Sequence, residues 1–229
     1  MKAKKCLNEE IERFIDEKIL LAWETISKYM LANSEVVISG TSYAKSKITN
    51  DDCLLIYGSS SLVLHVLIQA SRKFSNIHVI VVDSRPNLKG KIVLEQLVKN
   101  GFKCSYILIN AISFVMNRVT KVILGADALL ANGYVMSSIG SSQIALVAKS
   151  FNVPVVVCCE TYKFCEKVQT DALVNNELGN PMDLLSYSSR TINQKSPLAH
   201  WTQENKETEN INILNLVYDV TPPDLIVSY

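Results

Sequence analysis

The sequence lacks a charge imbalance, a long apolar run and a signal-peptide core. Its 229 residues include 23 Lys and Arg against 22 Asp and Glu. A balanced charge lacks the basic footprint of nucleic-acid-binding and membrane-surface proteins, so we expect neither partner. No apolar run reaches the roughly 18 residues that a transmembrane helix needs. The N-terminus has no apolar signal-peptide core, and the protein is therefore expected to be cytoplasmic.

Cysteine motifs and histidines are also scarce. None of the six cysteines forms a C-x-x-C pair, and only three histidines are present. Without a secretion signal, these cysteines do not predict a disulfide framework. Cys158, Cys159 and Cys165 lie near Glu160, but no histidine is close in sequence, so we expect no metal site. A reactive thiol at Cys159 or Cys165 stays an open alternative, because a helix N-terminus lowers the pKa of a thiol.

What remains is the composition of a globular protein, with 48% hydrophobic and 20% charged residues. Apolar residues spaced by three and four over residues 7–30 predict a long N-terminal helix. The polar stretch 32–50 is interpreted as a linker with room for a short strand at 36–38. We therefore divide the chain into a helical segment with its linker, residues 1–50, and an α/β domain, residues 51–229.

Within residues 51–229, short continuous apolar runs alternate with longer amphipathic segments. Runs of this kind fit strands covered on both faces, and the segments between them are long enough for crossover helices. The fold class predicted is α/β: a Rossmann-like, doubly wound, mostly parallel sheet with a short N-terminal helical segment. The predicted strands are residues 53–57, 77–82, 104–109, 121–124 and 153–158, and the predicted helices are residues 60–71, 89–100 and 141–150.

The loops at the carboxyl ends of the strands are the candidate sites, because ligands bind there in open parallel sheets. Gly58 and Ser59 precede the predicted helix at residues 60–71, where backbone N–H groups either meet an anion or simply form a turn and a cap. Arg85 follows the second strand and either binds a phosphate or carboxylate or pairs with Asp83.

A further loop, Gly125-Ala126-Asp127, follows the fourth predicted strand. Asp127 is suited to general acid–base chemistry or to capping the next turn, and Asn132-Gly133 is a turn signal. Ser141 opens a helix and either binds an anion or caps it. No dinucleotide or P-loop motif is present, and no cofactor is expected. These residues predict a Rossmann-like domain with a sugar-phosphate site, without deciding between an enzyme and a binding subunit.

Several runs resemble a known superfamily: VDSRP at 82–86 with Gly90, GADALLANG at 125–133, and the Ile-Gly step at 139–140. This superfamily is shared by sugar-phosphate isomerases, such as methylthioribose-1-phosphate isomerase, and by the alpha, beta and delta regulatory subunits of eukaryotic translation initiation factor 2B. Residues 152–171, 175–178 and 214–223 are similar to the delta branch in particular.

The sequence differs from the isomerases at positions that the resemblance implies are catalytic. The resemblance implies that isomerases use a cysteine after the first strand and the aspartate of the Gly-Ala-Asp loop. Here Gly58 occupies the cysteine position, whereas Asp127 is kept. Ser137 and Ser138 replace an Asn-Lys pair. One carboxylate cannot run paired proton transfers, so the chain is expected not to be an enzyme. The residues expected to form a vestigial ligand pocket are Gly58, Ser59, Arg85, Asp127 and Ser141.

For the delta branch, the resemblance implies a non-catalytic regulatory subunit of the guanine-nucleotide exchange factor for translation initiation factor two. Such a subunit pairs with the beta subunit, assembles with alpha, gamma and epsilon, and supports GDP/GTP exchange by epsilon. Initiation factor two, which binds GTP and is regulated by phosphorylation of its alpha subunit, is a further partner. The chain is short at both ends of the delta pattern, which predicts weakened regulation. The alternative is a sugar-phosphate isomerase or sugar-phosphate-binding protein of the same superfamily.

The predicted subunit interface consists of Tyr162, Phe164, Asn175, Glu177 and Leu178.

Overall fold

The computed structural model describes residues 48–173, 175–185 and 212–227. The predicted N-terminal helix, most of the linker and the strand suggested at 36–38 lie outside these residues. The division of the chain near residue 50 therefore stays a prediction. No helix within the described residues is long and apolar enough to cross a membrane.

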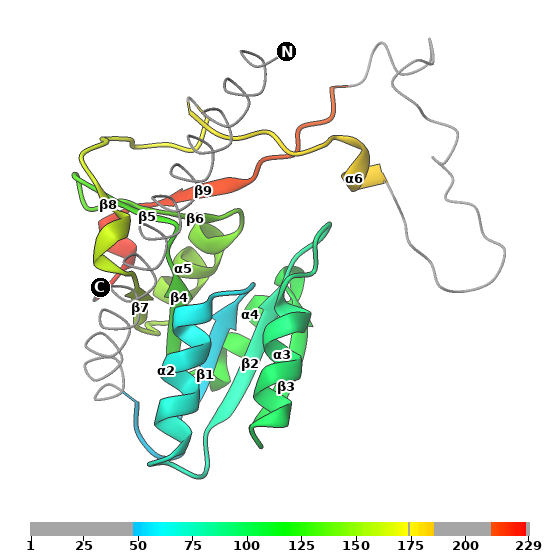
Figure 1. Ribbon diagram of the computed structural model, residues 1–229, viewed down its shortest axis with the longest axis vertical. Helices are drawn as coiled ribbons and strands as arrows, with labels where there is room; N and C mark the ends of the chain where they lie inside the picture. The colour runs from blue at the N-terminus through cyan, green and yellow to red at the C-terminus, as the bar shows by residue number, and fades with distance from the viewer. Residues whose placement is uncertain (1–47, 174, 186–211, 228–229) are drawn as a thin grey trace, which may run out of the picture.

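A five-stranded parallel sheet forms the centre of the domain (Figure 1). Its strands stand in the order β3-β2-β1-β4-β7, and every neighbouring pair is parallel. This order confirms the predicted doubly wound sheet. The winding direction reverses at β1, and the crevice between β1 and β4 at their carboxyl ends is where such folds bind ligands. The strands are β1 (Cys53–Tyr57), β2 (His78–Asp83), β3 (Lys103–Leu108), β4 (Lys121–Gly125) and β7 (Val155–Cys158).

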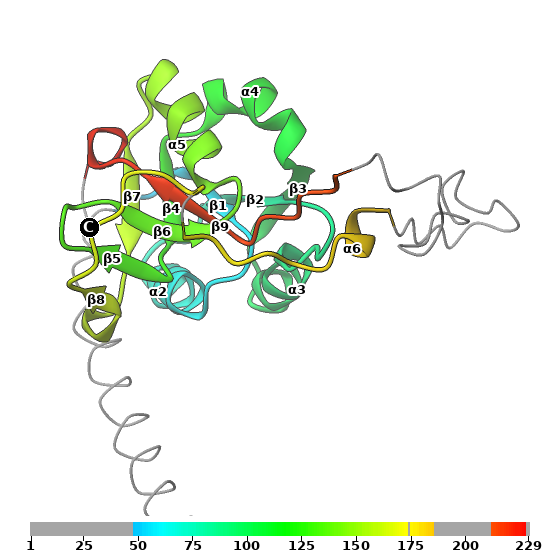
Figure 2. The same cartoon turned by 90° about the horizontal axis from the view of Figure 1, so that it is seen from above.

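Helices cover both faces of this sheet, which explains why the strands read as continuous apolar runs (Figure 2). In β1, Leu54 and Ile56 pack toward α2 and α3, whereas Leu55 and Tyr57 pack toward α4 and α5. The helices are α2 (Ser61–Ser71), α3 (Gly90–Lys99), α4 (Ile112–Val115) and α5 (Ser141–Ser150), with the 3-10 turns η1 (Ile109–Ala111) and η2 (Met116–Arg118) on either side of α4.

A second, four-stranded sheet of order β8-β5-β6-β9 lies over the carboxyl end of the first, and the apolar pattern did not predict it. β5 and β6 form an antiparallel hairpin around Gly133, whose φ is 79° and whose N–H donates to the Leu130 carbonyl at 2.9 Å. The turn signal at Asn132-Gly133 therefore marks a hairpin inserted before α5. The remaining elements are β5 (Ala128–Leu130), β6 (Val135–Ser138), η3 (Thr161–Lys163), β8 (Phe164–Cys165), α6 (Met182–Leu185), β9 (Tyr218–Thr221) and η5 (Pro223–Leu225).

Candidate functional site

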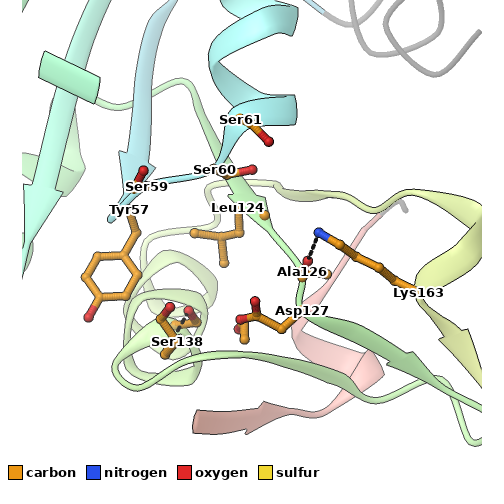
Figure 3. A pocket seen from close by; sticks show the side chains of 12 residues that line it. Tyr57, Ser59, Ser60, Ser61, Leu124, Ala126, Asp127, Ser138 and Lys163 are labelled. Atoms are coloured by element: carbon orange, nitrogen blue, oxygen red, sulfur yellow. Dashed lines mark hydrogen bonds between the residues drawn. The ribbon is translucent and has the colours of Figure 1, made fainter. Parts of the chain in front are cut away.

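Two cavities lie side by side where the strands of the larger sheet end. The inner cavity has a volume of about 130 Å³ and is lined by Ser59, Asp127, Ser137, Ser141 and Lys163, among others (Figure 3). The outer cavity has a volume of about 180 Å³. Gly58, Ser59, Arg85 and Asp127 line the outer cavity. The structure thus brings all five predicted pocket residues to one edge, while their role as a ligand pocket stays a prediction.

The first loop forms a turn and a helix cap. Gly58 has a φ of 61°, a left-handed conformation that favours glycine, and its N–H donates to the Val82 carbonyl at 3.0 Å. The Ser60 hydroxyl accepts from Val63 N–H at 3.3 Å and caps α2. A side-chain carbon added at Gly58 would meet no other atom within 4 Å. The loop therefore places no thiol in the cavity. The Gly58 N–H and the Ser60 hydroxyl already have partners, and Ser59 lines both cavities.

The second loop is organised by a buried carboxylate. Asp83 is 2% exposed and accepts hydrogen bonds from Ser84 N–H and from the Tyr106 hydroxyl, each at 2.9 Å. Burial, reinforced by Asp83, raises the pKa of Tyr106 to about 12, so its hydroxyl remains a donor at neutral pH. The following Arg85–Pro86 peptide bond is cis, and Arg85 lies at the outer cavity.

Asp127 lies between the two cavities and projects its carboxylate into them (Figure 3). Loss of surrounding water raises the pKa of this carboxyl; Lys163 and Lys89 oppose the rise, and Glu160 adds to it. Among the contacts of the described residues, none is a hydrogen bond to this carboxylate. The next turn is closed instead by Gly133 N–H, and the Asn132 side chain donates to the Gln169 carbonyl at 3.0 Å. The described contacts of this turn thus do not use the Asp127 carboxylate, and the capping alternative stays a prediction.

Lys163 is a cavity residue that sequence reasoning missed. Its ammonium lies 2.7 Å from Glu160 Oε2 and donates to the Ala126 carbonyl at 2.8 Å (Figure 3). Burial lowers the pKa of Lys163, but the hydrogen bond and charge of Glu160 outweigh this and raise it. The sequence signal was the three-residue spacing of an acid and a base after a buried strand.

The thiols near this lysine are protonated at neutral pH. Burial raises the pKa of Cys159 to about 11 and that of Cys158 to about 12. A reactive thiolate at Cys159 is thereby disfavoured. In the part of the chain that the structure describes, no group of three His, Cys, Asp or Glu side chains is placed to hold a metal.

The N-terminus of α5 is closed by the protein itself. Gly140 N–H and Ser142 N–H both donate to Asp219 Oδ2 at 3.0 Å, and the Ser141 hydroxyl donates to the Ser138 carbonyl at 2.7 Å. The Ser141 hydroxyl thus closes a turn with Ser138 and does not cap the helix, because it donates to a carbonyl. By contrast, the Ser137 hydroxyl is buried in the inner cavity wall and has no hydrogen-bond partner among the described residues.

The predicted interface residues fall in two places. Tyr162 in η3 and Phe164 in β8 lie at one edge of the smaller sheet and are 41% and 56% exposed. Asn175, Glu177 and Leu178 lie in the segment that leads away toward α6, at the other end of that sheet (Figures 1 and 2). Leu178 is 65% exposed.

Fold and site together define a Rossmann-like α/β protein with a polar cavity at the strand ends and an added sheet above it. Comparison with known proteins identifies the family within this class. The chain belongs to the Initiation factor 2 subunit family, which matches residues 1–229, and this confirms the resemblance.

Relatives of both branches are similar to this chain. It is 40% identical over 203 residues to translation initiation factor eIF2B subunit delta of Dictyostelium discoideum, covering 89% of this chain and 32% of that protein. It is 33% identical to ribose 1,5-bisphosphate isomerase of Pyrococcus furiosus, covering 87% of this chain and 58% of the isomerase. The chain thus spans less than two thirds of either relative.

A solved structure supports the fold. The crystal structure of the tetrameric eIF2B-beta2-delta2 complex from C. thermophilum matches with a TM-score of 0.66 at 23% identity, covering 85% of this chain and 54% of that chain.

Proposed function

We propose that this chain is a delta-type, non-catalytic regulatory subunit of the guanine-nucleotide exchange factor for translation initiation factor two. In this role it pairs with the beta subunit in the cytoplasm, assembles with alpha, gamma and epsilon, and supports GDP/GTP exchange by epsilon on initiation factor two. The 40% identity to a delta subunit over most of this chain supports the proposal.

The observation that carries the non-catalytic part is the first strand-end loop. Gly58 stands where the resemblance implies a catalytic cysteine, and its N–H is already bonded to Val82. Of the charged residues that line the inner cavity, Lys163 is paired with Glu160, and Asp127 is the single carboxylate. A single carboxylate does not support aldose–ketose isomerisation.

The isomerase relative makes a sugar-phosphate isomerase the second candidate. Its test is turnover of ribose 1,5-bisphosphate and methylthioribose-1-phosphate by the purified chain. We expect no turnover. Turnover that disappears in Asp127→Asn would establish the second candidate instead.

The pairing surface is proposed to include Tyr162, Phe164, Asn175, Glu177 and Leu178. Tyr162, Phe164 and Leu178 are apolar or aromatic and exposed, and such side chains favour protein contacts over water. Phe164 is the central test residue because it lies on β8, whose outer edge is free of other described strands.

The experiment is co-expression of the full chain with a beta subunit, followed by affinity purification and native mass spectrometry. We expect a stable complex, and loss of it in Phe164→Asp. The matched control is Phe114→Asp, because Phe114 on α4 is 78% exposed but lies on another face. Failure of the unaltered chain to bind beta would refute the proposed function. Adding the remaining subunits and measuring nucleotide exchange on initiation factor two then tests the regulatory role.

A further inference from the structure

Two segments far apart in sequence leave the smaller sheet side by side; we call residues 175–183 and 212–217 the strap. Gly179 N–H donates to the Asn215 carbonyl at 2.8 Å, Val217 N–H donates to the Glu177 carbonyl at 3.1 Å, and Leu178 pairs with Leu216 in an antiparallel bridge. Figures 1 and 2 show the yellow and orange-red segments running together toward α6. The strap is a two-stranded ribbon that continues β9.

Asparagine side chains hold the two segments together. Asn176 accepts from Tyr218 N–H at 3.0 Å and donates to the Tyr218 carbonyl at 2.7 Å, which fixes the base of the strap. Farther out, the Asn215 amide donates to the Asn180 carbonyl at 2.8 Å. A side chain at Gly179 would begin 2.8 Å from the Asn215 amide nitrogen, so glycine permits this close approach. These contacts join one segment to the other, not the strap to the larger sheet.

The strap forms one wall of the outer cavity. Gly179, Leu216 and Val217 line this cavity opposite Ser59 and Arg85, which belong to the loops after β1 and β2. The cavity is therefore bounded by two parts of the fold. One consists of strand-end loops that the core holds in place. The other is a ribbon joined to the rest of the domain at its base, where the Val217 carbonyl accepts from Ile139 N–H at 3.0 Å, and held farther out by contacts between its own two segments. Any change in the position of the strap changes access to the cavity.

The strap also exposes leucines. Leu178 is 65% exposed and Leu214 is 55% exposed. Glu177 and Asp183 are its acidic residues, and neither segment contains Lys or Arg. A two-stranded ribbon alone is marginally stable in water and becomes stable when an apolar face is covered. Its composition fits a partner with an apolar centre and a basic rim.

We propose that a partner subunit of this chemistry docks on the strap through Leu178 and Leu214 and thereby fixes the wall of the outer cavity. The inference rests on the proposed function, because it takes the beta subunit as the partner. Subunit assembly and access to the strand-end cavity are then coupled, and the coupling is reciprocal: whatever orders the strap from the cavity side strengthens subunit binding.

Hydrogen exchange of the full chain, alone and in complex with the beta subunit, tests the docking. We expect exchange of the Gly179 and Val217 amides to slow about tenfold or more in the complex, because their acceptors lie on the opposite segment. Leu178→Asp combined with Leu214→Asp should remove this protection and weaken the complex. Leu146→Asp is the matched control, since Leu146 on α5 is 59% exposed on a different face.

The coupling to the cavity is tested by an introduced thiol. Asn87 lines the outer cavity and is exposed. Asn87→Cys should react with iodoacetamide several times more slowly in the complex, as followed by mass spectrometry of the peptide that contains it. Binding of beta without strap protection, or with unchanged labelling, would overturn this inference and leave the proposed function intact. Absence of binding would overturn both.

Discussion

Asp219, on the last strand of the smaller sheet, accepts the backbone N–H of Ser142 at 3.0 Å and so closes the N-terminus of α5. The same oxygen accepts from Gly140 N–H at 3.0 Å. A carboxylate that binds two otherwise unpaired helix N–H groups acts as a cap supplied from outside the helix. This contact joins residues separated by 77 positions and locks the smaller sheet onto the larger one.

Asp219→Ala should therefore destabilise the protein by about 1–2 kcal/mol, within the range of a lost helix cap. Asp219→Asn should cost less, because its amide oxygen still accepts. Urea denaturation of the full chain measures both. The control is Asp224→Ala, since Asp224 pairs with Lys149 at 3.1 Å on the surface and should change stability by about 0.5 kcal/mol or less. Equal effects at the two positions would contradict the capping role.

An ion pair between Asp52 and Lys121 joins the residue before β1 to the first residue of β4. Asp52 is 4% exposed and lies 2.7 Å from Lys121 Nζ, while Thr120 and Thr49 also donate to it. Lys121→Met should cost about 2–4 kcal/mol, because it leaves a buried carboxylate without its cation. Thermal denaturation at neutral pH measures the loss, and Lys149→Met serves as the exposed control.

The same pair predicts a pH dependence. Burial raises the pKa of Asp52, but hydrogen bonds from Lys121 and the two threonines outweigh it and hold the pKa below its ordinary value. A lowered folded-state pKa stabilises the fold above the unfolded value, near 3.8, and this stability is lost as the pH falls through the folded-state pKa. Asp52→Asn should therefore show a flatter loss of stability below about pH 4. Identical acid profiles would contradict this.

Close packing at Gly90 gives another test. A side-chain carbon there would lie 2.9 Å from Asp83 Cγ, whose carboxylate is held by the Tyr106 hydroxyl. Gly90→Ala should displace Asp83 and cost about 1–3 kcal/mol, despite the better helix propensity of alanine. Tyr106→Phe should cost about 1 kcal/mol by itself. Because both changes break one contact, the double variant should lose less than their sum.

The charge of Asp127 should destabilise the fold at neutral pH, whereas that of Asp52 stabilises it. Loss of surrounding water raises its folded-state pKa, so its charge opposes folding at neutral pH. Asp127→Asn should therefore be more stable than the unaltered chain at pH 7. The gain should shrink as the pH falls through the raised pKa and vanish below the unfolded value. Denaturation midpoints across pH 3–7 measure this, and a loss of stability at pH 7 would show that the carboxylate has a structural partner.

The larger sheet was predictable because both of its faces are covered. In β1, alternate residues such as Leu54 and Leu55 enter different core clusters, so the whole strand is apolar and stands out from its flanks. The smaller sheet was not predictable in the same way. β8 has two residues and β5 has three, too few for any periodicity. β6 and β9 pair across some 80 residues, through contacts that local patterns do not reveal.

The residues of the candidate site likewise fall into those that the local sequence predicted and those that depend on distant contacts. Gly58, Arg85 and Asp127 were found because strand ends meet at one edge of a parallel sheet. Lys163 was missed because its role depends on the Ala126 carbonyl, 37 residues away. The wall formed by Gly179 and Val217 was missed because residues 171–181 carry turn-forming residues and give no strand signal. Their order comes from pairing with the segment near Asn215.

The core clusters and the strand-end residues are almost separate sets. The apolar side chains that hold the larger sheet together do not include Gly58, Ser59, Arg85 or Asp127. Substitution of these strand-end residues therefore leaves most of the free energy of folding unchanged. A lineage with this architecture can lose or change its chemistry in few steps while its scaffold persists, which is how one fold comes to serve both enzymes and subunits of larger assemblies.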